Sequence, residues 1–255
     1  MTEAATPEGV RLARRVAELV GCSRREAELY IEGGWVRVDG EVVETPQFRV
    51  QDQTVELDPA ARRQPVAAPA PVTFVLHKPT GIIAAAAAGQ AGAAIDLLRP
   101  EQRDPSDRSG IRPLQRHLRG LELVTPLETA ASGLLVYTQD WRVRRKLVDD
   151  GALVEHEVMV DVRGTVSPEA LQRLNQAPVI DGRAMAPARV SVNRQTGDVT
   201  GLRFALKGYR PGQIAQMCTT AGLEVLAIRR LRIGRLPLAG LPEGQWRYLL
   251  PYERF

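Results

Sequence analysis

The side chains whose type and spacing could perform chemistry in this sequence are mainly arginines. The chain holds 34 lysines and arginines against 30 acidic residues, for a net charge of +4. Residues 99–119 hold six arginines against three acids, and residues 202–255 hold nine cations against three glutamates. An arginine guanidinium can donate two parallel hydrogen bonds to a phosphate. This distribution indicates a polyanion partner such as RNA or DNA, and a solvated surface in an arginine-rich proteome is the alternative.

The other reactive side chains lack the spacing that metal binding or a catalytic triad needs. The histidines are isolated in the sequence, and we expect structural or surface roles for His77, His117 and His156. The two cysteines are far apart, so we expect free thiols in a reducing cytoplasm at Cys22 and Cys218. We expect core or interface positions, in preference to base-stacking platforms, for Trp35, Trp141 and Trp246. Backbone turns are expected at Gly81, Gly133 and Gly222.

The length and composition favour an ordinary globular protein with two domains. The chain has 255 residues, of which 44% are hydrophobic and 25% charged. No run of eighteen apolar residues is present, and residues 1–15 lack the apolar core of a signal peptide. We therefore expect a cytoplasmic protein without a membrane span.

The local patterns of residues 11–57 predict a small module with two helices and a hairpin. Apolar residues at helical spacing precede Gly21, which can end a first helix. Ser23 and Glu26 can form a capping box at the start of a second helix, which Gly33 and Gly34 end. The dipeptide Asp39–Gly40 then joins two alternating segments, as in a tight hairpin.

This order of elements resembles the small RNA-binding domain named after ribosomal protein S-four, also called the alpha-L motif. The resemblance places that domain at residues 9–57 and implies phosphate contacts from basic residues around the second helix, namely Arg11, Arg14, Arg24 and Arg25. Acidic residues outnumber the arginines of the module, so RNA would be met by one face only. The alternative is a solvated first helical turn, in which cations oppose the helix dipole. A bound phosphate would remove that conflict.

Residues 58–71 are rich in proline and alanine and predict a semi-extended linker. From residue 72 to 255 strands dominate, with helices between them. We expect strands at 72–76, 133–138, 157–162, 188–192, 201–206, 224–228 and 230–233, and helices near 95–98, 141–148, 168–174 and 213–221. The expected fold class is α+β, with a mostly antiparallel sheet in the larger domain.

Three segments of the larger domain carry a second resemblance. Lys78–Gly81 follows a strand, as does the K-P-x-G segment of bacterial pseudouridine synthases. Leu127–Leu135 (LETAASGLL) resembles their central motif, G-R-L-D-x-x-T/S-x-G-L-L, and 208–236 resembles their C-terminal signature. Together with the N-terminal module, the chain resembles the RsuA-like branch, and RluF-like members above all. By this resemblance the further RNA contacts are Lys78, Arg229, Arg230 and Arg232.

The resemblance implies an isomerase that converts uridine to pseudouridine in RNA, acting as a monomer without cofactor or metal. The target nucleotide is flipped into a pocket. An aspartate of the central motif attacks it, an arginine two residues earlier supports that aspartate, and an aromatic residue of a K-x-Y strand packs on the base. Such chemistry depends on close placement of the carboxylate.

The sequence departs from the family pattern at each of these places. Glu128, one methylene longer, stands at the position of the aspartate, and Pro126 at that of its arginine. The K-x-Y strand reads His156–Val158, so Val158 replaces the aromatic residue. The R-Q-I/V-R-R-M helix reads Gly212–Met217 and has lost its arginines, and alanines 84–88 replace the polar residues after K-P-x-G.

These departures leave three hypotheses. The leading one is an RNA-binding protein of this family, with ribosomal RNA as its expected partner, whose catalysis is lost or impaired. The rival is an active ribosomal- or transfer-RNA pseudouridine synthase that uses Glu128 in place of aspartate. The third is a protein-interaction scaffold with residual RNA affinity, which steep salt dependence of RNA binding would contradict.

Overall fold

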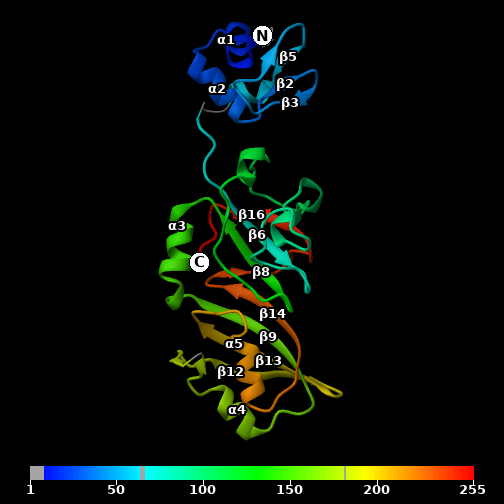
Figure 1. Cartoon of the computed structure of the whole chain (residues 1–255), viewed down its shortest axis with the longest axis vertical. Coiled ribbons are helices and arrows are strands. Elements are labelled where there is room, and N and C mark those ends of the chain that lie inside the picture. Colours follow the sequence, from blue (N-terminus) through cyan, green and yellow to red (C-terminus); the bar gives the residue numbers. More distant parts are fainter. Residues whose placement is uncertain (1–8, 64–66, 181) are drawn as a thin grey trace, which may run out of the picture. The chain divides into compact units, whose positions relative to one another are not determined.

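The computed structural model describes residues 9–63, 67–180 and 182–255. The described chain divides into two compact units, which we treat separately (Figure 1). Unit 1 combines the N-terminal residues up to Pro71 with the segment Arg112–Arg119, and unit 2 consists of Val72–Ile111 and Gly120–Phe255. Residues 64–66, within the expected linker, and residues 1–8, within the segment tested for a signal peptide, lie outside the described residues.

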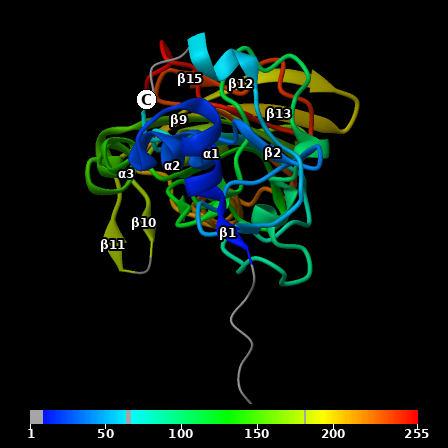
Figure 2. The ribbon, with the colours of Figure 1, turned by 90° about the horizontal axis from the view of Figure 1, so that it is seen from above.

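Unit 1 contains two short helices that lie side by side (Figures 1 and 2). Helix α1 (Leu12–Val20) buries Leu12, Ala13 and Val16, and Gly21 ends it with φ 72°. Helix α2 (Arg24–Glu32) starts with the predicted capping box, since the Ser23 hydroxyl accepts from the Glu26 amide and the Glu26 carboxylate from the Ser23 amide. The local signals for both helices are confirmed.

The strands of unit 1 follow the predicted hairpin. β2 (Val36–Val38) pairs with β3 (Glu41–Val42) across Asp39–Gly40, both of which have positive φ, and with β5 (Val55–Leu57). β1 (Val10–Arg11) pairs with β4 (Arg49–Val50). The first part of the expected linker forms a 3₁₀ turn at Pro59–Arg63, with Ala61 buried.

The segment Arg112–Arg119 completes unit 1, which the sequence did not indicate. Its Arg112 guanidinium donates to the Gly34 carbonyl and the Asp58 carboxylate and lies 4.0 Å from the ring centroid of Trp35. Leu114 is buried, and the Gln115 amide donates to the Glu44 carboxylate. These contacts bind residues far apart in the sequence into one unit.

The main element of unit 2, as far as the structure describes it, is a nine-stranded mixed sheet. The strand order is β12-β13-β9-β14-β8-β6-β16, with β15 paired to β14 and β7 paired to β8. The strands are β6 (Thr73–Lys78), β7 (Glu122–Leu123), β8 (Ala131–Thr138), β9 (Glu155–Arg163), β12 (Arg189–Thr196), β13 (Val199–Lys207), β14 (Val225–Ile233), β15 (Leu236–Pro237) and β16 (Trp246–Tyr248). The pairing of β14 with β8 is parallel and the other pairs are antiparallel. The α+β class is therefore confirmed.

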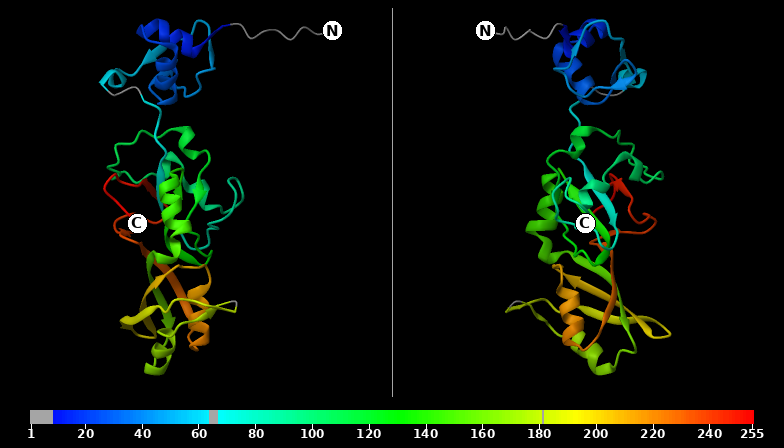
Figure 3. Two further views of the ribbon diagram at one scale, coloured as in Figure 1. Left: turned by 90° about the vertical axis from the view of Figure 1, so that its left-hand side faces the viewer. Right: turned by 45° about the vertical axis from the view of Figure 1, so that its right-hand side comes forward.

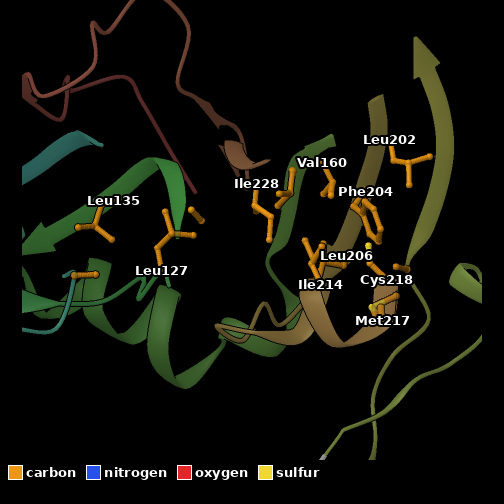
Figure 4. Close-up of a cluster of buried hydrophobic side chains, with 14 of the residues drawn as sticks. Leu127, Leu135, Val160, Leu202, Phe204, Leu206, Ile214, Met217, Cys218 and Ile228 are labelled. Carbon is orange, nitrogen blue, oxygen red and sulfur yellow. The ribbon is translucent and has the colours of Figure 1, made fainter. Parts of the chain in front are cut away.

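Helices α4 (Pro168–Leu174) and α5 (Gln213–Thr220) pack on the sheet (Figure 3). Figure 4 shows part of the core, in which side chains of β9 and β13 meet those of α5, and Leu127 packs near Leu135. Helix α3 (Trp141–Arg144) continues as a π-helical turn at Arg145–Asp149. β10 (Val179–Ile180) and β11 (Arg183–Ala184) form a separate hairpin (Figure 2), and short 3₁₀ turns lie at Ala94–Leu97, Pro100–Gln102, Gln115–Leu118 and Gly151–Leu153.

Two details of unit 2 correct the sequence-based expectations. The two strands expected at 224–228 and 230–233 are one strand, β14, with register shifts beside Ala227 and between Arg230 and Arg232. Gly133 lies inside β8 and not in a turn, with φ 115° and its α-carbon close to the backbone of Arg230. None of the described helices is long and apolar enough to cross a membrane.

Candidate active site

The loop that precedes β8 carries Glu128, and two buried cations hold the backbone of this loop. Arg230 of β14 donates to the carbonyls of Thr125 and Pro126, at 2.7 and 3.1 Å. Lys78, at the end of β6, reaches the carbonyl of Thr129 on the other side of Glu128, at 3.4 Å. Because Leu127 is buried in the core, the loop is anchored on both its polar and its apolar side. The position of the Glu128 carboxylate is thus set by residues distant in sequence.

Arg230 is fully buried, and its donors go to main-chain oxygens. Besides the two loop carbonyls, the Leu134 carbonyl accepts from Nε at 2.8 Å and from Nη2 at 2.6 Å. Burial lowers its pKa to about 10, which keeps the guanidinium charged at neutral pH. The prediction of Arg230 as an RNA contact is wrong, because no part of the side chain reaches solvent. Its place in the site is structural.

Lys78 is also fully buried, with its ammonium 2.8 Å from the carbonyls of Pro79 and Ile82. The prediction of Lys78 as an RNA contact is wrong for the same reason as for Arg230. Burial lowers the pKa of Lys78 to about 8, although the negative charge of Glu128 opposes that change. The ammonium therefore stabilises the turn that follows β6 and adds positive potential beside Glu128.

The lowered pKa of Lys78 predicts a pH dependence of stability. Between pH 8 and about 10.5 the unfolded chain keeps a proton that the folded chain has released, so the free energy of unfolding should rise with pH. At about 1.4 kcal/mol per pH unit, the gain is on the order of 3 kcal/mol. Urea unfolding of the wild type and of Lys78→Met across this window measures it, and the gain should be missing from the variant. Parallel curves for both proteins would refute the prediction.

Tyr209 covers Glu128 from the segment that follows β13. Its hydroxyl donates a short hydrogen bond to Oε2 of Glu128. The ring stacks on His156, with centroids 5.6 Å apart and planes at 29°, and lies 5.2 Å from the guanidinium carbon of Arg230. Burial, followed by the charge of Glu128, raises the pKa of Tyr209, so the phenol stays a hydrogen-bond donor. One oxygen of the Glu128 carboxylate is thus already hydrogen-bonded to a side chain of the protein itself.

Two positions that depart from the family pattern, Pro126 and Val158, lie against Arg230 in this cluster. Val158 is fully buried on β9, where it pairs with Phe204 and Arg230, and it offers no ring to a base. His156, two residues earlier, points to the same side of the sheet. Burial, with the charges of Arg230 and Arg232, lowers the pKa of His156 to about 3, so the imidazole is neutral. An aromatic ring is present beside the carboxylate, but Tyr209 and not residue 158 provides it.

A cavity of about 410 Å³ lies beside the cluster. Its lining includes Thr125, Pro126, His156 and Arg230, together with residues 124, 147–149, 151–152, 184–186 and 207–210, Tyr209 among them. Oε1 of Glu128 and Nδ1 of His156 are buried without a hydrogen-bond partner among the described residues. The site therefore combines a partly unsatisfied carboxylate with two buried cations and a hollow bordered by a tyrosine.

The expected RNA contacts of unit 1 are all on its surface. Arg11 is exposed on β1, and Arg14 is exposed on α1, where it pairs with Glu18. Arg24 and Arg25 are exposed in the first turn of α2, and both lie about 3.5 Å from Glu28. The four side chains are accessible to phosphates, and their role stays a prediction.

The other arginine-rich regions are used largely inside the protein. Arg103 donates to Asp107 and to the Ile111 carbonyl, and Arg112 binds within unit 1 as described. On β14, Arg232 pairs with Glu155 and Glu157, whereas Arg229 is exposed and makes no ion pair with a described residue. The two like-charged regions of the sequence are therefore not two free basic surfaces. Of the expected contacts on β14, Arg229 is exposed, and Arg232 is ion-paired with 27% of its side chain exposed; a role in RNA binding stays a prediction for both.

The sequence singled out Glu128 but not Tyr209, which lies 81 positions away. An aromatic residue between Gly208 and Gly212, both with positive φ, directly after a buried strand, was the available signal. His77 donates from Nδ1 to the Leu241 carbonyl, and His117 is buried in unit 1, as befits structural roles. Trp246 is a core residue, but Trp141 is 65% exposed and is not. Among the described residues no group of three or more His, Cys, Asp or Glu could hold a metal.

Comparison with known proteins finds a matching domain family, several relatives and a structure of the same fold. Residues 10–55 match the S4 domain family. The chain is 27% identical to "Ribosomal large subunit pseudouridine synthase B" of Bacillus subtilis (strain 168), over 95% of this chain and 93% of the relative. It is also 27% identical to "Dual-specificity RNA pseudouridine synthase RluF" of Escherichia coli (strain K12), over 96% of this chain and 77% of the relative.

A relative in Arabidopsis thaliana, named "Putative ribosomal large subunit pseudouridine synthase SVR1, chloroplastic", is 29% identical over 89% of this chain. The chain spans 55% of the length of that relative. A crystal structure of a pseudouridylate synthase has the same fold, with a TM-score of 0.57 and 18% identity over 94% of this chain and 96% of that one.

Proposed function

We propose that the chain is a member of the family of RNA pseudouridine synthases that carry an S4 domain, and that it binds structured RNA while its isomerase activity is lost or impaired. Ribosomal RNA is the proposed partner, in line with the name of the Bacillus subtilis relative. The observation that carries this proposal is the hydrogen bond from Tyr209 to Glu128, which engages the side chain at the position of the nucleophile.

The chemistry of the family needs a carboxylate that is free to attack the nucleotide. A nucleophile that accepts a hydrogen bond from a buried phenol must first lose that bond, and the phenol must leave the space. Pro126 supplies no charge where the family has a supporting arginine, and Arg230 binds carbonyls of the loop and makes no ion pair with Glu128. These features disfavour rapid attack and leave the fold intact.

RNA binding depends on summed charge and tolerates changes that catalysis does not. We propose residues 9–57 as the RNA-binding module, with Arg11, Arg14, Arg24 and Arg25 facing phosphates, and Arg229 as a contact in the domain 72–255. If each contact neutralises one phosphate, the logarithm of the binding constant falls by about 0.7–0.9 per contact for each tenfold rise in salt. A flat salt dependence would favour the protein-scaffold hypothesis.

An active isomerase that uses Glu128 is the second candidate, and one observation favours it. Oε1 of Glu128 is buried and has no hydrogen-bond partner among the described residues, while the charges of Lys78 and Arg230 act on the carboxylate. A carboxylate with one unsatisfied oxygen next to a cavity is suited to meet a ligand.

Tritium release separates the two candidates. RNA labelled at carbon five of uridine, from cells lacking this protein, is incubated with the purified protein, because pseudouridine formation expels that label. We expect no release above background, with RNA binding confirmed on the same preparation. Release by the wild type would overturn the proposal and make Glu128 the nucleophile to study.

Two variants extend the test. In an enzyme only slightly altered, Glu128→Asp should raise activity, and in a dismantled site it should change nothing. Tyr209→Phe removes the hydroxyl that engages Glu128 but keeps the ring on His156. We expect neither variant to release tritium and both to bind RNA as the wild type does. Cytoplasmic location and a monomeric state stay predictions, the latter open to gel filtration.

A further inference from the structure

The helical segment 141–149 of unit 2 begins with α3 (Figure 1). It carries an exposed tryptophan, Trp141, next to free cations. We propose that it contacts a single-stranded stretch of RNA, with Trp141 stacked on a base and Arg145 and Lys146 against phosphates. This inference rests on the proposed RNA binding and assigns part of it to a surface outside the S4 domain.

Trp141 is the most exposed of the three tryptophans, with 65% of its surface accessible. It is the first residue of helix α3. The preceding residue, Asp140, caps the helix, because its carboxylate accepts a hydrogen bond from the Arg142 amide. Trp246 is buried and the ring of Trp35 lies under Arg112, so those two indoles have structural partners. A single exposed apolar side chain is common on proteins and does not by itself indicate a binding site. Whether Trp141 can bind a ligand depends on the side chains around it.

The cations around Trp141 are of two kinds. Arg142 pairs with Asp140, and Arg144 pairs with Glu122 and Asp149. Arg145 and Lys146 are exposed and make no ion pair or side-chain hydrogen bond with any residue in the described part of the chain. Of the two acids that follow, Asp149 is the partner of Arg144, and Asp150, which comes after the helix, has no side-chain partner in the described part of the chain. Two free cations thus accompany the indole.

The helix places the ring and one free cation on the same face. The Arg145 amide donates to the Trp141 carbonyl, so the two residues are neighbours one turn apart. Arg145 and Lys146 lie at the junction of α3 with the π-helical turn, where the wider turn continues to Leu147. An exposed aromatic ring beside uncompensated positive charge is the combination that single-stranded nucleic acid binds, by base stacking and phosphate contact.

The same segment continues into the wall of the candidate site. Leu147, Val148 and Asp149 line the cavity of about 410 Å³ that Tyr209 and Arg230 also line. The cavity therefore adjoins the C-terminal end of the segment that begins with Trp141. A protein partner with an apolar surface would have to bury Arg145 and Lys146 unpaired, which is costly.

Fluorescence anisotropy with the full-length protein tests the proposal. The probe is a fluorescein-labelled hairpin RNA with a long unpaired loop, and a fully paired duplex of equal length is the comparison. Trp141→Ala should weaken binding of the hairpin by about 5- to 150-fold, the range for one stacked base. Trp141→Phe, which keeps an aromatic ring, should bind almost as the wild type does. Binding of the duplex should change little in either variant.

Tryptophan fluorescence reports on stacking directly. RNA should quench the emission of the wild type, and the quenched fraction should disappear in Trp141→Phe. The double variant Arg145→Ala, Lys146→Ala should reduce the slope of log binding constant against log salt by about 1.4, as expected for two contacts with a single strand. Arg142→Ala removes a cation that is already paired with Asp140 and should reduce that slope less.

Tyr252→Ala is the matched control, because Tyr252 is an aromatic residue of unit 2 that is 76% exposed. Its RNA affinity should equal that of the wild type, and circular dichroism should show every variant folded. If the wild type binds RNA and Trp141→Ala binds it equally well, this inference is overturned and the proposed RNA binding stands. The same holds if Tyr252→Ala weakens binding as much as Trp141→Ala does. A wild-type protein that binds neither RNA would overturn both.

Discussion

Replacement of Arg230 by leucine is expected to lower the free energy of unfolding of unit 2 by about 4 kcal/mol. The fully buried guanidinium donates to the carbonyls of Thr125, Pro126 and Leu134, and leucine leaves these oxygens without their donors. Hydrogen bonds to a charged group contribute about 1.5–3 kcal/mol each, and they are not additive. The variant should also release the loop that carries Glu128.

The neighbouring residue supplies the control for this prediction. Arg229→Leu makes the same chemical change on the same strand at an exposed side chain without an ion-pair partner in the described structure. It should alter stability by no more than about 0.5 kcal/mol. Urea unfolding can be followed by the fluorescence of buried Trp246, with Trp35 and Trp141 replaced by phenylalanine. Equal effects of the two leucine variants would show that Arg230 does not hold the loop.

Gly133→Ala is expected to destabilise unit 2 by at least about 3 kcal/mol. Gly133 is paired with Arg230 in the parallel ladder of β8 and β14 and has φ 115°. A β-carbon there would lie 2.3 Å from the carbonyl oxygen and 2.6 Å from the amide nitrogen of Arg230. Because both atoms belong to the backbone, relief requires the two strands to separate. The same unfolding experiment measures the loss.

Gly222→Ala separates backbone strain from close contact. Gly222 also has positive φ, 78°, but a β-carbon there would meet no atom within 4 Å. Alanine in this conformation should cost only about 1–2 kcal/mol. A loss at Gly133 no larger than that at Gly222 would mean that the contact between β8 and β14 relaxes easily.

Local signals in the sequence predicted much of the fold. The capping box at Ser23, the left-handed Gly21 and the Asp39–Gly40 turn each depend on residues within a few positions of one another. Helix α4 has the predicted bounds, Pro168–Leu174, since the Ser167 side chain caps it from the preceding position. Where the determinants are this close, the pattern of residue types is sufficient.

The site was less predictable because its contacts span long separations. Arg229 and Arg230 look alike in the sequence, yet one is exposed and the other fully buried, and this difference depends on the distant carbonyls that surround Arg230. The sequence also predicted two strands, at 224–228 and 230–233, whereas the single strand β14 runs through both arginines. Tyr209 follows β13 and Glu128 precedes β8, and these two strands are separated in the sheet by β9 and β14, so no local pattern brings the two residues together.

Unit 1 is assembled from two separate stretches of the chain, which affects when it can fold during synthesis. The chain is made from its N-terminus, so α1, α2 and the hairpin emerge well before Arg112–Arg119, which belongs to the same unit. Until that segment is made, Trp35 lacks the guanidinium of Arg112, and Asp58 and Glu44 lack their partners. The N-terminal module therefore reaches its final form only after the first strand of the following unit, β6, has been synthesised.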